Sequence, residues 1–136
     1  MTTSRKPRTG RKRQATARTA IEIKRAYDGP SSDDGLRILV DRLWPRGLSK
    51  TELKIDCWPK HITPSTELRR WYHGGGGSFP EFRRRYLQEL KAQGEGLDEL
   101  RALVRGRKVT LVTASRELES SHAKVLQDVL TQAAHA

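Results

Sequence analysis

The chain has 136 residues, of which 27 are Lys or Arg and 16 are Asp or Glu, for a formal net charge of +11. This length fits one domain with a core of its own. The single cysteine, Cys57, excludes a disulfide within the chain and a cysteine-based zinc cluster. One thiol, no signal-peptide pattern and no apolar run near the roughly 20 residues of a membrane helix lead us to expect a soluble, cytoplasmic protein without membrane contact.

The positive charge is concentrated at the N-terminus. Residues 1–20 contain seven basic residues and no acidic one, which leaves residues 21–136 with a net charge of +4. Because this segment has no apolar periodicity, we predict a disordered basic tail at 1–20 and a folded domain at 21–136. A basic tail attracts polyanions such as RNA, DNA or an anionic membrane. A solubilising extension without a specific partner and an Arg-rich transit peptide are alternative interpretations.

Two strands are predicted near the start of the domain. Residues 21–27 alternate apolar and polar side chains, which is the period of a half-buried strand. Residues 28–35 are dense in Gly, Pro, Ser and Asp and predict a loop. Residues 36–40 (LRILV) are apolar and β-branched, as in a more central strand.

Two helices are predicted in the middle of the chain. Ser49 and Glu52 have the spacing of a capping box, so a short helix begins there, and residues 55–58 are briefly extended. The next helix is predicted to begin at Thr63-Pro64, with Pro64 in the first helical position. Its apolar face consists of Leu68, Trp71 and Tyr72.

Four glycines at 74–77 end that helix and predict a flexible connection. A phosphate-binding loop needs spaced glycines, followed by Lys and Ser or Thr, directly after a strand. Because this run follows a helix instead, the sequence disfavours nucleotide binding by these glycines.

A further helix begins at a second capping box, formed by Ser78 and Glu81 with Pro80 in the first turn. Its apolar face consists of Phe79, Phe82, Tyr86 and Leu90. Arg83, Arg84 and Arg85 occupy the other side. They form either a solvated basic face or a patch that contacts nucleic-acid phosphates.

The last part of the chain predicts a helix ended by Gly106, a strand at 109–113 and a final helix. The helical faces consist of Leu97, Leu100, Leu103 and Val104, and of Ala123, Leu126, Val129 and Leu130. A long helical crossover between buried strands favours parallel pairing. We therefore predict a single α/β domain with a small, mostly parallel sheet flanked by helices.

Polar residues follow two of the predicted strands. The stretch DRLWPRGLSK (41–50) follows the second strand and TASR (113–116) follows the third. Ligands of α/β proteins bind beyond the carboxyl ends of strands, so these stretches converge if the two strands are neighbours. The converging residues are then Asp41, Arg42, Arg46, Ser115 and Arg116, with His122 joining from the last helix.

The residue types in the first stretch suit an anionic ligand. Arg presents a planar fork of donors to carboxylate or phosphate, and Trp44 offers a flat face. Pro45 and Gly47 shape the backbone, and Asp41 can orient an arginine or accept a proton. The alternative is structural: Asp41 and an arginine form a buried ion pair, Trp44 fills the core, and His122 has no catalytic role.

Familiar catalytic templates are absent from the sequence. There is no Gly-x-Ser-x-Gly motif, no Walker sequence and no paired-glycine dinucleotide fingerprint. The histidines lack metal-ligand spacing, and Cys57 has no base near it in sequence, so we expect no metal and no cofactor. Whether the protein is an enzyme stays open, with Asp41 and His122 as candidates for proton transfer.

Four stretches closely resemble the YeaO-like branch of the DUF488 family, a bacterial domain family of unknown function. They read VDRLWPRGLSK, TPSTELRRWYHG, FRRRYLQEL and VTLVTASRELESSHAKVLQDVL. The resemblance covers all of the chain but the tail, and it implies a compact cytoplasmic α/β domain without an established activity. The characteristic residues of the family correspond here to Asp41, Arg42, Trp44, Pro45, Arg46, Gly47, Ser65, Thr66, Glu67, Leu68, Arg69 and His122.

The chain departs from the family pattern at two positions. Thr113 stands where the family commonly has an aromatic residue, and Ser121 stands where it commonly has Asn. More distant relatives have a Cys near the end of this strand, and its absence here argues against thiol chemistry. The resemblance also adds weight to residues 65–67, whose simpler role is to cap a helix, although the same turn presents N–H groups to an anion.

The leading hypothesis is a small-molecule site for a phosphate- or carboxylate-bearing compound. Its predicted ligand-binding residues are Asp41, Arg42, Trp44, Arg46, Gly47, Ser65, Thr66, Arg69, Ser115 and Arg116. One alternative is a nucleic-acid-binding accessory protein that uses the tail and residues 83–85. Another is a structural module without a ligand site.

Overall fold

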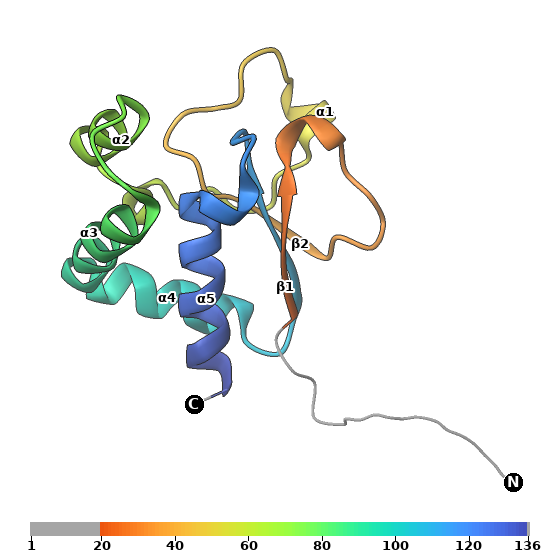
Figure 1. Cartoon of the computed structure of the whole chain (residues 1–136). Helices are drawn as coiled ribbons and strands as arrows, with labels where there is room; N and C mark the ends of the chain where they lie inside the picture. Colours follow the sequence, from red (N-terminus) through yellow and green to blue (C-terminus); the bar gives the residue numbers. More distant parts are fainter. Residues whose placement is uncertain (1–19, 136) are drawn as a thin grey trace, which may run out of the picture.

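Three parallel strands form the sheet of the computed structural model, which describes residues 20–135 (Figure 1). Strand β1 spans Ala20–Arg25, β2 spans Leu36–Leu39 and β3 spans Lys108–Thr113. The order is β1-β3-β2, and β3 pairs in parallel with both neighbours. The predicted α/β class and parallel pairing are thus confirmed. The predicted basic tail lies outside the described residues except for its last position, Ala20.

Helices surround this sheet and connect its strands. The α-helices of the described residues are α1 (Lys50–Leu53), α2 (Thr66–His73), α3 (Phe79–Ala92), α4 (Gly94–Val104) and α5 (His122–His135). Single 3-10 turns are η2 (Ala26–Asp28), η3 (Lys60–Ile62) and η4 (Leu118–Ser120). The long segment between β2 and β3 therefore holds four of these α-helices.

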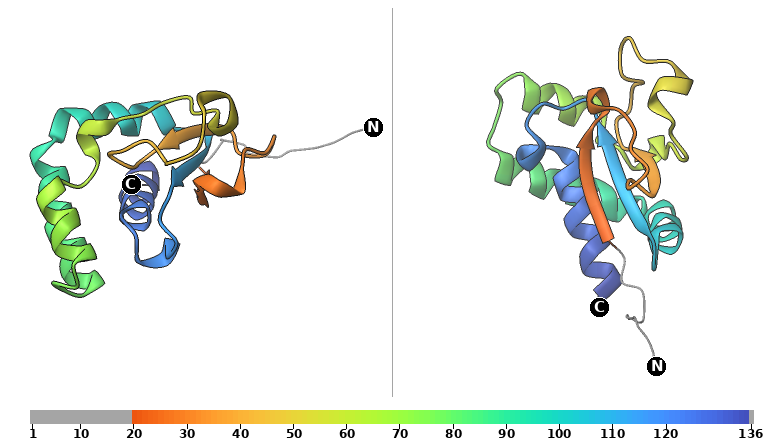
Figure 2. Two further views of the ribbon diagram at one scale, coloured as in Figure 1. Left: turned by 90° about the horizontal axis from the view of Figure 1, so that it is seen from above. Right: turned by 90° about the vertical axis from the view of Figure 1, so that its right-hand side faces the viewer.

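The two faces of the sheet are covered differently, because alternate residues of each strand point to opposite sides. Ile38 and Leu111 belong to the main core with residues of α3, α4 and α5. Leu39 and Val112 belong to a smaller cluster with Leu53 of α1. Accordingly, α3 to α5 lie on one side of the sheet and the segment with α1 on the other (Figure 2).

The start of α2 differs from the prediction. The helix begins at Thr66, and Ser65 caps it by accepting a hydrogen bond from the backbone N–H of Leu68 at 3.1 Å. Pro64 is buried ahead of the cap and is not the first helical residue. Thr63 caps the end of the preceding turn η3, and its hydroxyl donates to the Lys60 carbonyl at 2.7 Å. The prediction of a helix start at Thr63-Pro64 was therefore wrong.

The two predicted capping boxes have different outcomes. Ser49 and Glu52 form the complete reciprocal box at the start of α1. At the start of α3, Ser78 accepts from the Glu81 N–H at 3.4 Å, but the Glu81 carboxylate accepts from Arg84 and Arg85 instead. Glu81 is therefore an ion-pair partner at this helix start.

The last two glycines of the run at 74–77 lie close to the ring of Trp71 in α2. A Cβ added to Gly77 would lie 2.1 Å from the Trp71 ring atom Cζ2, and one added to Gly76 would lie 2.6 Å from Cδ1. On the ring face, the Arg85 guanidinium lies 4.2 Å from the Trp71 ring centroid. Glycines are required here so that the chain can approach Trp71.

A buried ion pair joins the β1–β2 loop to α1. Arg37 is 4% exposed, and its Nη1 donates to Asp34 Oδ2 at 2.6 Å. Its Nε and Nη2 donate to the Leu53 carbonyl at 3.1 and 2.8 Å. The sequence suggested a buried structural ion pair between Asp41 and an arginine. The buried Asp–Arg pair of the structure is instead formed by Asp34 and Arg37.

Candidate functional site

The candidate site lies where β2 and β3 end side by side. Beyond the last residue of β2, the Val40 N–H still donates to the Val112 carbonyl at 3.0 Å. The next residue, Asp41, therefore reaches the end of β3. The two polar stretches identified in the sequence do follow neighbouring strands.

Asp41 is the centre of a hydrogen-bond network. Its Oδ1 accepts from the Thr113 hydroxyl at 2.7 Å and pairs with His122 Nε2 at 2.8 Å, while its Oδ2 accepts from the Ala114 N–H at 2.8 Å. Burial tends to raise the pKa of the Asp41 carboxyl, but the hydrogen bond and charge of His122 and the bonds from Thr113 and Ala114 outweigh it. The pKa therefore lies below its ordinary value, and Asp41 is ionised at neutral pH.

His122 is fixed by this carboxylate. An ionised carboxylate has no proton to give, so Nε2 must carry a hydrogen and donate to Asp41. The other ring nitrogen, Nδ1, makes no hydrogen bond with the part of the chain that the structure describes. The side chain is only 12% exposed and lines a cavity beside the start of α5.

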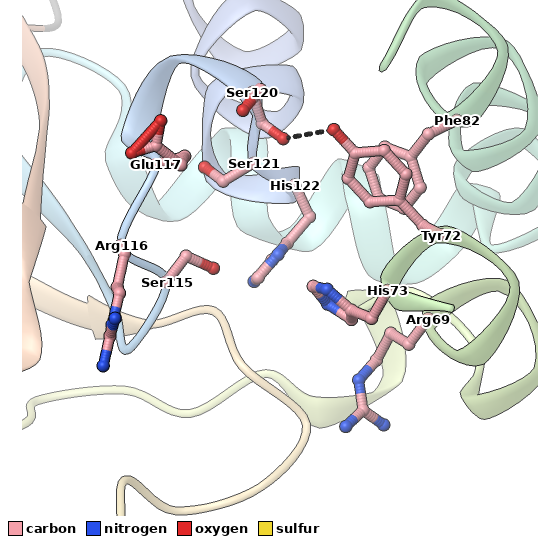
Figure 3. Close-up of a pocket in the computed structure, with 10 residues that line it drawn as sticks. All are labelled: Arg69, Tyr72, His73, Phe82, Ser115, Arg116, Glu117, Ser120, Ser121 and His122. Atoms are coloured by element: carbon pink, nitrogen blue, oxygen red, sulfur yellow. Dashed lines mark hydrogen bonds between the residues drawn. The ribbon is translucent and has the colours of Figure 1, made fainter. Parts of the chain in front are cut away.

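This cavity has a volume of about 370 Å³ and lies between α2, α3, the loop after β3 and the start of α5. His73, His122 and Ser115 point into it from different elements (Figure 3). Its lining residues are Arg69, Tyr72, His73, Phe82, Ser115, Arg116, Glu117, Ser120, Ser121 and His122.

Two arginines of the cavity have free guanidinium groups. Arg69 comes from α2 and Arg116 from the loop after β3, and neither forms a hydrogen bond or ion pair through its side chain with the described residues. Arg83, Arg84 and Arg85 behave differently. Arg83 pairs with Asp128, and the other two pair with Glu81.

An aromatic wall closes one side of the cavity. The Tyr72 hydroxyl donates to the Ser120 carbonyl at 2.9 Å and so joins α2 to η4. The Tyr72 ring stacks on Phe82 with 4.4 Å between centroids and 19° between planes. The sequence assigned both residues only to apolar helix faces, and nothing in it indicated that they meet the loop after β3.

Arg42 lines a second cavity, whose lining includes neither Arg69 nor Arg116. Its Nε donates to the Pro64 carbonyl at 3.1 Å and its Nη2 to the Thr63 carbonyl at 3.4 Å. The second cavity measures about 260 Å³ and is also lined by His61, Tyr86 and Glu89. The guanidinium of Arg42 therefore supports the backbone that leads into α2.

The rest of the Trp-Pro-Arg-Gly stretch lies near the α1 side of the sheet. The Trp44 indole N–H donates to the Leu48 carbonyl at 2.6 Å, and its ring meets Trp58 edge-on at 5.4 Å. Arg46 is exposed, with its carbonyl accepting from the Tyr27 hydroxyl at 2.9 Å. Gly47 has a φ of +85°, which permits the turn before Leu48. None of these residues lines the 370 Å³ cavity.

The two predicted residues at the start of α2 also lie outside the cavity. Ser65 donates to Glu89 Oε2 at 2.6 Å and lines the second cavity, while Thr66 is exposed. The structure therefore brings together Arg69, Ser115 and Arg116 from the predicted ligand-binding set. Asp41 and His122 join them through their mutual bond.

The described residues contain neither a metal-ligand cluster nor a membrane span. Among residues 20–135, no group of three or more His, Cys, Asp or Glu side chains is arranged to hold a metal ion. Within the same residues, no helix has both the length and the apolar character required to cross a membrane.

The chain belongs to the DUF488 family. Residues 20–136 match the family model described as "Inactive DUF488-N3 subclade". The chain is 44% identical over 110 residues to "Uncharacterized protein YeaO" of Escherichia coli (strain K12), an alignment that covers 81% of this chain and 96% of YeaO. The predicted assignment to YeaO-like proteins is thereby confirmed.

Mycobacterial relatives are equally similar. "Uncharacterized protein Rv3073c" of Mycobacterium tuberculosis (strain ATCC 25618 / H37Rv) is 44% identical over 112 residues, which are 82% of this chain and 94% of the relative. "Uncharacterized protein Mb3100c" of Mycobacterium bovis has the same identity and coverage. No solved structure matches the chain.

Proposed function

We propose that this protein binds an anionic small molecule, bearing phosphate or carboxylate, in the cavity beside Asp41 and His122. The observation that carries the proposal is that two arginines line one cavity, Arg69 and Arg116, and that their guanidinium groups have no partner among the described residues. Arginine forks match the geometry of carboxylate and phosphate oxygens. The first turn of α5 adds positive partial charge, because Ser121 and His122 line the same cavity.

The residues proposed here to contact the anion differ from those predicted from the sequence, which centred on the loop after β2. Arg42 donates to two backbone carbonyls, and Arg46 lies away from the cavity. Arg69 and Arg116 are therefore the better candidates to contact the anion. Asp41 does not contact the anion in this proposal. Its carboxylate accepts hydrogen bonds from Thr113, Ala114 and His122, which stabilise its negative charge.

Binding is favoured over catalysis. The family description calls the matched subclade inactive, and the chain belongs to that family. Asp41 and His122 have the geometry of a carboxylate that orients an imidazole. In this proposal, Asp41 holds the imidazole of His122 in one orientation, and the imidazole forms part of the cavity wall.

The experiment is a thermal-shift screen of the full chain against phosphate- and carboxylate-bearing compounds, with two matched variants. Arg69→Ala removes a cavity guanidinium, and Arg70→Ala removes the next residue of α2, which is exposed and does not line the cavity. Ligand at about 100 times its Kd stabilises a protein by about 2.7 kcal/mol, which raises Tm by several degrees.

We expect a compound that shifts the wild type and the Arg70→Ala variant but not the Arg69→Ala variant. Both variants keep residues 1–20, so general attraction of anions to that basic segment affects them equally. Equal loss in both variants, or no shift with any compound, would contradict the proposal.

A further inference from the structure

We infer that the ligand is a nucleoside monophosphate: a compound that joins one flat ring to one anionic group through a short polar linker. This inference rests on the proposed function and assigns the class of its ligand. The aromatic wall, the position of the cations along α2, and the acceptor groups of the cavity support it.

The wall offers ring surface. Tyr72 and His73 line the cavity with 5.7 Å between their ring centroids. The Tyr72 hydroxyl already donates to Ser120, so Tyr72 presents its ring to a ligand and its hydroxyl is occupied. A phosphate or carboxylate alone gains nothing from such a surface, whereas a planar base stacks on it.

The wall is also held in place before any ligand arrives. Tyr72 stacks on Phe82, which is 2% exposed. The centroid of the Phe82 ring lies 5.9 Å from that of the buried Tyr86 ring. A ring fixed by its neighbours loses little conformational freedom on binding. Stacking on Tyr72 therefore adds directly to affinity.

The cation and the rings lie on one face of one helix. Arg69, Tyr72 and His73 are three and four residues apart in α2, and all three line the cavity. One helical turn, about 5.4 Å, thus separates the Cα atom of Arg69 from those of Tyr72 and His73 along the helix axis. That separation suits a base and a phosphate connected by a sugar.

The remaining polar groups suit the sugar. Glu117 lines the cavity, and its carboxylate makes no hydrogen bond or ion pair with the described residues. A carboxylate repels a purely anionic ligand but accepts hydrogen bonds from sugar hydroxyls. The volume of about 370 Å³ lies near the small end of ligand pockets, roughly 300–1,000 Å³, which favours a mononucleotide over a dinucleotide.

The test compares AMP, UMP, ribose 5-phosphate and adenosine by isothermal titration calorimetry with the full chain. Attraction of phosphate to the basic N-terminal segment is common to the nucleotides and ribose 5-phosphate. The ratio of their affinities therefore measures the contribution of the base ring to binding. We expect at least one of the two nucleotides to bind about tenfold or more tighter than ribose 5-phosphate. We expect adenosine to bind more weakly than AMP.

Variants at Tyr72 separate the ring from the hydroxyl. Tyr72→Phe keeps the ring and loses the bond to Ser120, so it should retain the preference for the nucleotide. Tyr72→Leu removes the ring and should lower nucleotide affinity about tenfold while leaving ribose 5-phosphate unchanged. His73→Ala, at an exposed position, serves the same purpose if Tyr72→Leu does not fold.

The outcomes distinguish this inference from the function on which it rests. Equal binding of nucleotides and ribose 5-phosphate, lost in Arg69→Ala, overturns the ligand class and keeps the anion site. Binding of carboxylates in place of all phosphates likewise overturns the ligand class alone. No binding of any anion overturns both.

Discussion

The Asp41 carboxylate accepts hydrogen bonds from three parts of the chain: the end of β3, the loop that follows it and the first residue of α5. Each bond is 2.8 Å or shorter. Hydrogen bonds to a buried charged group stabilise more than neutral ones, because the group has given up its water. Asp41 therefore contributes to stability and also orients His122, which lines the cavity.

Replacing Asp41 with Asn should lower the free energy of unfolding at pH 7 by about 1.5–3 kcal/mol. The amide keeps the shape of the carboxylate but loses its charge, and its NH₂ group cannot accept from Ala114 or His122. Urea unfolding of Asp41→Asn beside Asp33→Asn measures the effect. Asp33 is exposed, so its variant should change stability by less than about 0.5 kcal/mol. Equal effects at the two positions would contradict the role of Asp41.

The wild type and the Asp41→Asn variant also test how this stabilisation depends on pH. The pKa of Asp41 is lower in the folded state than the value of about 3.9 in an unfolded chain. Its stabilisation is therefore fully present above pH 4–5 or so and is lost as the pH falls through the lower, folded pKa. We expect the difference in unfolding free energy between the wild type and Asp41→Asn to shrink as the pH is lowered below about 4. A difference that grows at low pH would show that the folded pKa is raised.

At the level of elements, the position of α2 decides the composition of the site. The helix carries three cavity residues on one face, and Trp71 on the same helix contacts the glycine run. The ring of Trp71 lies against Gly76 and Gly77, with the Arg85 guanidinium over its face. The connection from α2 to α3 thus packs against the Trp71 ring in addition to joining the two helices.

Gly77→Ala should destabilise the protein by about 1–3 kcal/mol, because a methyl group would overlap the Trp71 ring and force it to move. Tryptophan fluorescence should change with it, as Trp71 leaves its place beside Arg85. Gly94→Ala is the control, since nothing lies within 4 Å of a Cβ at that position. A Gly77→Ala protein as stable as the wild type would mean that the run accommodates side chains.

The local features of this site and the meeting of its two strand ends could be predicted from the sequence, whereas the directions of its long side chains could not. The helix start at Ser49 and the strand ends before Asp41 and after Thr113 follow from residues close together in sequence. The direction of Arg42 depends on carbonyls more than twenty residues away, at Thr63 and Pro64. No periodicity reports such contacts.

The aromatic wall shows the same limit. In the sequence, Tyr72 and Phe82 look like ordinary core positions. Their role depends on the contact between Tyr72 and Ser120, which are 48 residues apart in the sequence. The predicted start of α2 was wrong for a nearer reason: Pro64 fits a first helical position, but a serine one residue later fits an N-cap as well.

In the whole molecule, the central place of β3 explains why the site combines residues that are far apart in the sequence. Asp41 follows one edge strand, the loop at 114–121 follows the central strand, and α2 belongs to the crossover between them. The register of β3 with β2 places Thr113 beside Asp41. The site therefore forms only once β2 and β3 have paired.

The boundary of the domain yields the last prediction. Strand β1 begins at Ala20, whose N–H donates to the Arg107 carbonyl at 3.0 Å, and the family match also begins at residue 20. A chain that lacks residues 1–19 should therefore keep the melting temperature of the full chain and any Arg69-dependent ligand shift. Its formal net charge falls from +11 to +4, because seven basic residues are removed.

Binding of a short RNA or DNA oligonucleotide to the two chains separates the remaining hypothesis of a nucleic-acid partner from the small-molecule site. Each phosphate neutralised by a Lys or Arg contributes about 0.9 to the slope of log Kobs against log salt concentration for duplex DNA. If the N-terminal segment supplies these contacts, its removal should lower both the affinity and the slope. An unchanged slope would assign the contacts to the domain itself, where Arg83, Arg84 and Arg85 already pair with Asp128 and Glu81 and would have to exchange those partners for phosphates. A lower melting temperature of the shortened chain would instead place the domain boundary before Ala20.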